Sequence, residues 1–316
     1  MAMLGRSANG VYWMCRYLER AENTARLLEA GYRLAMTSGH NAARSEWQSV
    51  LVTIGQEAAY RQTHEDYSGV QVANYILRDR DNPASVLRMI EMARTNARAV
   101  RTSITREVWE ATNESWMTLS ELMARPIRIT TLGEVLAQIR RHAALVRGAM
   151  DGTMLRNEVF NFARIGTFIE RADNTARILD VKYYVLLPSV GLVGSALDNV
   201  QWETVLRALA GERAYRWLNG GRMDARGISQ FIILDSRFPR SIAFTYEKLR
   251  SNMASLAREY GQESQAHVML RDAGARLHGS TIDDIFEFGL HEFITQTIVR
   301  TREIANAISS EYRFTA

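Results

Sequence analysis

The chain contains very little cysteine, proline or lysine, and each scarcity excludes something. Cys15 is the only cysteine among 316 residues, so one chain can form neither a disulfide nor a zinc site built on several cysteines. We interpret Cys15 as a small apolar residue on a helix, because a reactive thiol needs an electropositive setting. This composition fits a reducing compartment, and we expect a cytoplasmic protein.

Prolines are few and apolar runs are short. The stretches between prolines are rich in Ala, Leu, Arg, Glu and Met, which favour helices. No run of apolar residues is long enough for a membrane span, and the first twenty residues are too charged for a signal peptide. The sequence therefore predicts an all-α protein with no substantial sheet and no membrane association. The four prolines are Pro83, Pro126, Pro188 and Pro239.

Basic residues are almost all arginine, since Lys182 and Lys248 are the only lysines, and the net charge is +4. Arginine favours bidentate contacts with carboxylates and phosphates, so acidic ligands and nucleic acid both come into question. The 35 acidic residues are interspersed with the arginines, and no basic block carries interleaved aromatics. Nucleic acid is therefore not the partner that we expect.

Apolar residues recur at intervals of three and four along most of the chain, which is typical of a multi-helix bundle. The tract 231–234 is short enough to be a strand, but we predict a helix there. Segment 187–199 and the Gly220-Gly221 region are predicted loops. The predicted helices cover 8–36, 45–60, 70–79, 84–105, 107–124, 130–154, 157–186, 200–210, 212–219, 226–235, 240–260 and 281–312.

An internal repeat is the most informative feature of the sequence. Residues 18–29 recur as residues 169–180 with only conservative differences, and a degenerate third copy lies at 91–98. The wide spacing indicates duplication of a large unit rather than a solenoid. We therefore predict two related helical halves, 1–150 and 151–316, within one continuous body.

Each complete copy carries a stripe of acids, an asparagine and an arginine beside an apolar stripe. Three interpretations are open: the charges pair with one another and fix helix register, they line a ligand pocket, or they dock a partner. One specific hypothesis is that Glu19, Arg26, Glu170 and Arg177 form a single interior network. The candidate ligand-binding residues are Glu19, Glu22, Asn23, Arg26, Glu170, Asp173, Asn174 and Arg177.

Two weaker candidate sites lie nearer the end of the chain. Arg237, Arg240 and Ser241 would surround a helix N-terminus if Pro239 stands in its first turn, and this predicts either an anion site or a capped corner. Asp284, Glu287 and His291 would share one helical face at metal-ligand spacing, but such residues are usually ordinary surface groups, and we expect no metal. Phosphate-loop, nucleophile-elbow and HExxH motifs are absent from the sequence.

Several tracts make the chain resemble the bacterial Alpha-E family over essentially its whole length. The resemblance implies a helical protein named for a Glu-Arg motif, which falls here on Glu19-Arg20 and Glu170-Arg171. It also implies a gene found beside ATP-grasp amidoligases, transglutaminase-like proteins and proteasome-like hydrolases. The tracts are Tyr12-Trp13-Met14 with 16–26, 93–101 with Trp109-Glu110, 169–180, and the Phe-Pro-Arg-Ser-Ile tract at 238–242.

Such neighbours imply a role in making or attaching a peptide, with the ATP-grasp partner supplying the acyl-phosphate chemistry. We therefore expect an accessory or substrate-binding component that takes an amino-acid or peptide-like ligand and needs no cofactor. One alternative is a transferase or hydrolase that uses paired carboxylates. Another is binding of RNA or aminoacyl-RNA through surface arginines, and a homodimer is one assembly that the sequence allows.

Overall fold

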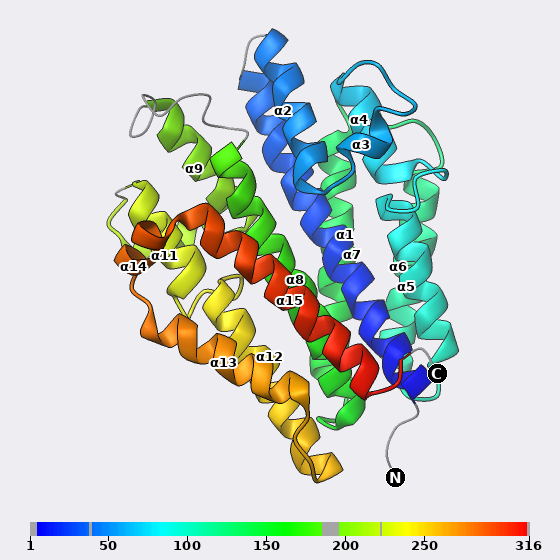
Figure 1. Ribbon diagram of the computed structural model, residues 1–316. Helices are drawn as coiled ribbons and strands as arrows, with labels where there is room; N and C mark the ends of the chain where they lie inside the picture. Colours follow the sequence, from blue (N-terminus) through cyan, green and yellow to red (C-terminus); the bar gives the residue numbers. More distant parts are fainter. Residues whose placement is uncertain (1–4, 38–39, 185–195, 222, 315–316) are drawn as a thin grey trace. The chain divides into compact units, whose positions relative to one another are not determined.

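The computed structural model describes residues 5–37, 40–184, 196–221 and 223–314. Within these ranges the chain forms fifteen helices and no strand, which confirms the predicted all-α class (Figure 1). The helices up to residue 184 are α1 (Gly5–Thr37), α2 (His40–Thr53), α3 (Glu57–Tyr60), α4 (Gly69–Arg78), α5 (Val86–Ala99), α6 (Arg106–Leu122), α7 (Leu132–Thr153) and α8 (Glu158–Tyr184). The others are α9 (Ala196–Ala208), α10 (Glu212–Leu218), α11 (Ala225–Leu234), α12 (Ile242–Tyr260), α13 (Gln265–Gly279), α14 (Ile282–Phe288) and α15 (Leu290–Glu311).

The helices belong to two compact units. Residues 17–154 form the first, here called the N-terminal unit, and residues 1–16 together with 155–316 form the C-terminal unit. Helix α1 contributes its first residues to the C-terminal unit and the remainder to the N-terminal unit. Duplication of the chain into halves 1–150 and 151–316 stays a prediction.

Three helices of the N-terminal unit begin at a hydroxyl side chain. Ser68, Ser85 and Thr105 each accept a hydrogen bond from the backbone N–H three residues further on, at the starts of α4, α5 and α6. Such a cap contributes about 1 kcal/mol, because it satisfies an N–H group that the helix itself leaves unpaired. Helix α5 packs against α4 and α6, and α6 packs against α7, so the capped helices form a layered bundle.

The C-terminal unit is built around α8, which packs against α12 and α15. Phe162 of α8 is fully buried, and its ring meets Tyr312 edge-on at 4.9 Å. Gly166 lies against α1, because a Cβ atom there would overlap the carbonyl oxygen of Tyr12. The absence of a side chain at residue 166 thus lets the two helices approach closely.

Two predicted helices are divided at a glycine. The predicted helix 45–60 is α2 and α3, separated at Gly55 with φ of 70°, and the predicted helix 281–312 is α14 and α15, separated at Gly289 with φ of 109°. Glycine adopts such angles without steric cost, so the chain can turn where the apolar pattern is continuous.

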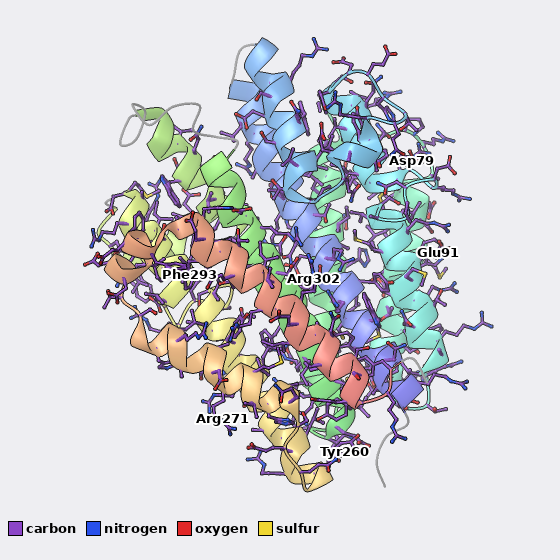
Figure 2. All side chains as sticks on the ribbon, in the orientation of Figure 1. Asp79, Glu91, Tyr260, Arg271, Phe293 and Arg302 are labelled. Carbon is purple, nitrogen blue, oxygen red and sulfur yellow. The ribbon has the colours of Figure 1, made fainter. Side chains whose placement is uncertain are left out.

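Helix α13 was not predicted from the sequence. Helix α12 ends at Tyr260, Gly261 takes a left-handed conformation with φ of 73°, and α13 follows. Figure 2 labels Tyr260 at the end of α12 and Arg271 on α13. The buried stripe of α13 is short and includes only one large apolar residue, Leu270. Because two alanines and a histidine fill its other positions, the apolar periodicity is too weak to mark a helix.

Two predicted loops and the expected absence of a membrane span can also be compared with the structure. The predicted loop at 187–199 lies largely outside the described residues, and α9 begins at Ala196. Gly220 and Gly221, both with positive φ, separate α10 from α11 as predicted. Among the described helices, none is sufficiently long and apolar to cross a membrane.

Candidate functional site

The first repeated tract places two glutamates of α1 in the interior. Glu19 is 2% exposed and Glu22 is 0% exposed. Arg26, one turn further on, donates its Nε and Nη2 to Glu22 Oε1 at 3.0 and 2.7 Å. Arg147 of α7 donates its Nη1 to Glu22 Oε2 at 2.7 Å and lies 3.5 Å from Glu19 Oε2. Both carboxylate oxygens of Glu22 therefore accept hydrogen bonds from guanidinium groups.

The same two helices carry another ion pair further along. Arg140 of α7 contacts Glu29 of α1, which also accepts a hydrogen bond from Arg33 at 3.1 Å. Glu29 follows Glu22 by seven residues, and Arg140 precedes Arg147 by seven. Since seven residues span about 10.5 Å of helix, antiparallel helices bring both pairs into register.

The charges of this cluster stabilise one another. Burial disfavours the charged form of Arg147, but the carboxylates of Glu22 and Glu19 outweigh it, so the pKa of Arg147 is raised above its ordinary value. Removing one partner of a buried pair leaves an uncompensated charge, which costs about 3–5 kcal/mol. Within this unit, the arrangement is that of ion pairs that fix the register of α1 against α7.

The second repeated tract, on α8, buries Glu170 against an arginine of another helix. Arg16 of α1 donates its Nε to Glu170 Oε2 at 3.0 Å. Its guanidinium carbon also lies 4.6 Å from the ring centroid of Trp13, and its Nη1 donates to the Tyr12 hydroxyl at 3.3 Å. Burial lowers the pKa of Arg16, but the interactions with Tyr12 and Glu170 outweigh this and raise it. In each unit, the glutamate of a Glu-Arg pair is therefore buried against an arginine from outside the repeat.

Two further residues of the second tract hold the turn between α11 and α12. Arg171 donates its Nη1 to the carbonyl oxygen of Pro239 at 3.1 Å. Thr175, which is fully buried, donates its hydroxyl to the carbonyl oxygen of Arg240 at 2.9 Å. The repeated tract and the Phe-Pro-Arg-Ser tract are therefore in direct contact.

The predicted anion site is arranged differently from the expectation. Helix α12 begins at Ile242, so Pro239 lies before the helix rather than in its first turn. Ser241 is the N-cap, and its hydroxyl accepts from Phe244 N and donates to the carbonyl oxygen of Asp235.

Arg237 is exposed and pairs with the Asp235 carboxylate at 2.7 Å, and this contact lowers the pKa of Asp235. The side chain of Arg240 is buried. The geometry is that of a capped corner, and anion binding by Arg237, Arg240 and Ser241 stays a prediction.

The remaining predicted ligand residues lie beside these pairs. Asp173 accepts from Arg177 at 2.6 and 3.3 Å, and both side chains are partly exposed. Asn23 is buried and Asn174 is half-buried. The first repeated tract belongs to the N-terminal unit and the second to the C-terminal unit. A single network formed by Glu19, Arg26, Glu170 and Arg177 stays a prediction.

The three residues considered for a metal do not share one helix. Gly289 separates Asp284 and Glu287 on α14 from His291 on α15. Asp284 completes the cap of α14 by accepting from Thr281, and His291 pairs with Asp180 at 2.7 Å. The expectation of a common helical face was wrong. Among the described residues, no three histidine, cysteine, aspartate or glutamate side chains are grouped to hold a metal ion.

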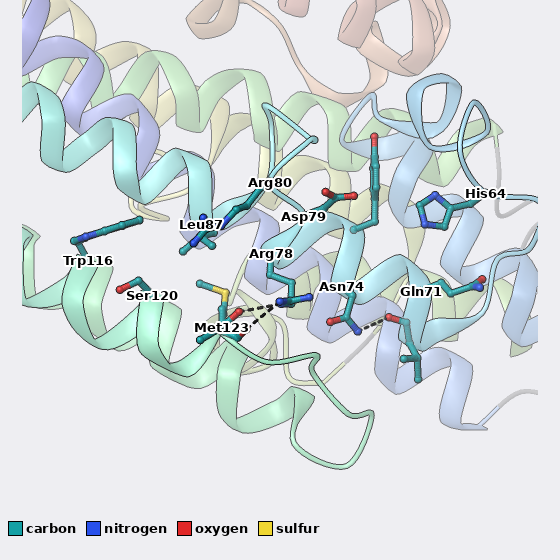
Figure 3. A pocket seen from close by; sticks show the side chains of 13 residues that line it. His64, Gln71, Asn74, Arg78, Asp79, Arg80, Leu87, Trp116, Ser120 and Met123 are labelled. Carbon is teal, nitrogen blue, oxygen red and sulfur yellow. Dashed lines mark hydrogen bonds between the residues drawn. The ribbon is translucent and has the colours of Figure 1, made fainter.

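A cleft that the sequence did not reveal lies in the N-terminal unit. It has a volume of about 440 Å³ and is lined by α4, the C-terminal half of α6 and the loops next to them (Figure 3). Trp116 and Val70 supply apolar surface, and His64, Arg78 and Arg80 supply polar groups. The volume is within the range of about 300–1,000 Å³ that is typical of small-molecule sites.

Helix α4 builds one wall of this cleft and holds the segment that follows α6. Asn74 donates to the carbonyl oxygen of Ile127 at 2.9 Å and accepts from its N–H at 2.8 Å. Arg78 donates its Nε to the carbonyl oxygen of Met123 at 2.9 Å and its Nη2 to that of Ala124 at 3.1 Å (Figure 3). Because cationic side chains suit helix C-termini, these bonds hold Arg78 in a defined position beside the cleft.

Aromatic side chains support the end of the cleft at which His64 lies. His64 stacks on the buried ring of Tyr60 with centroids 4.4 Å apart, and it meets Tyr75 edge-on at 5.6 Å. Tyr60 donates its hydroxyl to the carbonyl oxygen of Asp66 at 2.6 Å, which anchors the loop before α4. Burial and the nearby carboxylate of Asp79 raise the pKa of Tyr75, so its phenol stays protonated at neutral pH.

The comparison with protein families concerns nearly the whole chain. Alpha-E, a family described as a predicted alpha-helical domain with a conserved ER motif, matches residues 3–312. The chain belongs to the Alpha-E family. The helical domain of that description agrees with the fold of this Alpha-E chain. The Glu-Arg pairs of its repeated tracts, Glu19-Arg20 and Glu170-Arg171, lie on α1 and α8.

Relatives of this Alpha-E chain include longer proteins of mycobacteria. Uncharacterized proteins of Mycobacterium bovis and Mycobacterium tuberculosis are each 21% identical to it over 329 aligned residues. The match covers 96% of this chain but 36% of each relative, so the chain spans about a third of their length. No solved structure matches the chain.

Proposed function

We propose that this Alpha-E chain is an accessory, ligand-binding component of a peptide-synthesis or protein-modification system. Its ligand is an amino acid or a peptide-like molecule, and its binding site is the cleft of the N-terminal unit. The observation that carries this proposal is a cleft of about 440 Å³ that combines the Trp116 ring with two arginines, Arg78 and Arg80. Small-molecule sites characteristically combine such apolar surface with a few polar groups.

The signature carboxylates favour a binding role over catalysis by this chain alone. A general base must reach the proton that it removes. Glu22 is fully buried and both of its oxygens accept from guanidinium groups, while Glu170 is buried against Arg16. These contacts support a structural role for the Glu-Arg motif, with ligand recognition elsewhere.

The mycobacterial relatives support action together with another protein. The larger part of each relative lies outside the region that matches this chain. Domains that are joined in one protein act at high effective concentration, whereas separate chains must bind each other. We propose an ATP-grasp amidoligase as the partner, with transglutaminase-like or proteasome-like proteins as further members of the system, in the cytoplasm.

Reconstitution tests this proposal. The chain and an ATP-grasp amidoligase from the same organism are incubated with ATP and amino acids, together and separately, and ADP and new amides are measured. We expect amide formation that needs the ligase and increases when the chain is added. Amide formation by the chain alone would instead identify an enzyme, and RNA affinity that falls steeply with salt would identify an RNA-binding protein. Either result would contradict the accessory role.

A further inference from the structure

We infer that the cleft recognises a carboxylate attached to a large apolar or aromatic group, such as the C-terminal residue of a peptide. The carboxylate lies at Arg78 and Arg80, and the apolar group lies on Trp116. This inference rests on the proposed ligand-binding function of the cleft and specifies the chemical class of the ligand.

The first argument is an excess of positive charge. Arg80 is exposed and makes no hydrogen bond or ion pair with any described residue, whereas Arg88 on the neighbouring helix pairs with Glu91 at 2.7 Å. Arg78 bonds only to carbonyl oxygens, which leave its charge without a carboxylate partner within the described chain. Asp79 accepts from the backbone N–H of the second residue after it and forms no ion pair with either arginine. Two guanidinium groups therefore face the cleft against one carboxylate, which favours an anionic ligand.

The second argument separates a carboxylate from a phosphate. Both are oxyanions that arginine binds well. The cleft, however, lies where α4 ends at Arg78 and α6 ends at Leu122. Helix C-termini carry partial negative charge and disfavour anions, a doubly charged phosphate more than a singly charged carboxylate. Arg78 uses its Nε and Nη2 to donate to two carbonyl groups, which hold the guanidinium in place, and its Nη1 can donate to the carboxylate with little loss of side-chain freedom.

The third argument concerns the shape of the site. Figure 3 shows Trp116 at one end, His64 at the other, and Arg78 between them. Trp116 is half-buried, and its ring supplies apolar surface at this end, beside Ser120. Gln71 and His64 make the other end polar. A peptide held by its terminal carboxylate would thus direct its last side chain to Trp116 and its preceding residue towards His64.

Paired ligands test the inference. Binding of alanyl-phenylalanine and its C-terminal amide to the purified chain is measured by isothermal titration calorimetry, with phenyl phosphate and inorganic phosphate as further probes. We expect the free acid to bind about ten- to hundredfold more tightly than the amide, because one charge-assisted contact contributes that much. Arg80→Gln should reduce the difference, because it removes one of the two guanidinium groups that the carboxylate contacts and leaves Arg78 in place. Arg98→Gln is the matched control, because Arg98 is also exposed but lies eleven residues beyond Leu87 on α5, about 16 Å along the helix.

The outcomes separate the inference from the function on which it rests. Equal binding of acid and amide would overturn the carboxylate assignment while leaving the cleft a ligand site. Tighter binding of phenyl phosphate that Arg80→Gln weakens would overturn it in favour of a phosphate ligand. No binding of any probe, together with normal reconstitution with the ligase, would overturn the inference alone. Failure of both experiments would overturn the proposed function as well. Weaker binding by Trp116→Leu, with circular dichroism unchanged, would support the position of the apolar group.

Discussion

Arg171 donates a hydrogen bond to the carbonyl oxygen of Pro239 at 3.1 Å, across 68 positions of the sequence. The contact joins the second Glu-Arg pair to the Phe-Pro-Arg-Ser tract, and Thr175 adds a second bond, to Arg240. Two tracts that underlie the resemblance to the Alpha-E family are therefore parts of one structural feature, which sets where the chain turns from α11 into α12. We interpret Arg171, the arginine of the second Glu-Arg pair, as a residue that fixes the backbone of the turn between α11 and α12.

Replacing Thr175 with valine tests whether the contact between the two tracts stabilises the fold. Thr175→Val keeps the shape of the side chain but leaves the buried carbonyl oxygen of Arg240 without its hydroxyl donor. We expect the free energy of unfolding to fall by about 0.5–1.5 kcal/mol, the net contribution of a typical hydrogen bond. Urea unfolding followed by circular dichroism measures it. Thr95→Val is the control, because Thr95 makes the same kind of bond, to Glu91, on an exposed helix face. Equal effects of the two changes would contradict the role of Thr175.

Removing the charge of Glu22 should destabilise the N-terminal unit. Glu22→Gln preserves the volume of the side chain but leaves Arg26 and Arg147 without the carboxylate that both contact. We expect a loss of about 3–5 kcal/mol, or somewhat less if the amide oxygen still accepts one hydrogen bond. The matched control is Glu110→Gln, since Glu110 and its partner Arg106 are 55% and 83% exposed and their pairing contributes little. If both variants unfold at the same urea concentration, the buried cluster does not stabilise the unit.

Much of the fold could be predicted because helical periodicity is a local property. Most helices appeared near their predicted positions, since their apolar stripes recur every three or four residues. The failures are local too. Gly289 interrupts a stripe that is otherwise continuous, and α13 has a stripe of mostly small residues. In both places, the apolar pattern does not determine the helix boundaries, and backbone conformation and tertiary packing do.

The candidate sites were predictable only where their partners are close in sequence. The pair Glu22–Arg26 follows from helix geometry, because residues four apart share a face. Arg147 and Arg16 could not be found this way, since they reach their glutamates from 125 and 154 positions away. The cleft is harder still. Its residues come from separate segments, and Arg80 is distinguished only by the absence of a partner within the described structure.

Adding one methyl group should have opposite effects at two glycines of the C-terminal unit. Gly166→Ala places a Cβ against the carbonyl oxygen of Tyr12, so α1 and α8 must separate. Overpacking of this kind costs about 1–3 kcal/mol. Gly274 lies within α13 with no atom within 4 Å of an added Cβ, so Gly274→Ala should stabilise the protein by about 0.4–1 kcal/mol. Thermal unfolding measures both changes, and destabilisation by Gly274→Ala would contradict the open space beside α13.

Acidification should weaken the fold through His142 of α7. This side chain is buried, its Nδ1 has no hydrogen-bond partner, and burial lowers its pKa below the ordinary value of 6.5. The unfolded chain therefore binds the proton first, and stability rises with pH wherever the unfolded state holds more protons. The contribution of His142 is constant above pH 6.5; below it, stability falls until the folded-state pKa is reached. Urea unfolding at intervals from pH 8 to about 5 should show a smaller loss for His142→Gln than for the unchanged chain. Parallel pH dependences would show that the folded protein protonates His142 as readily as the unfolded chain does.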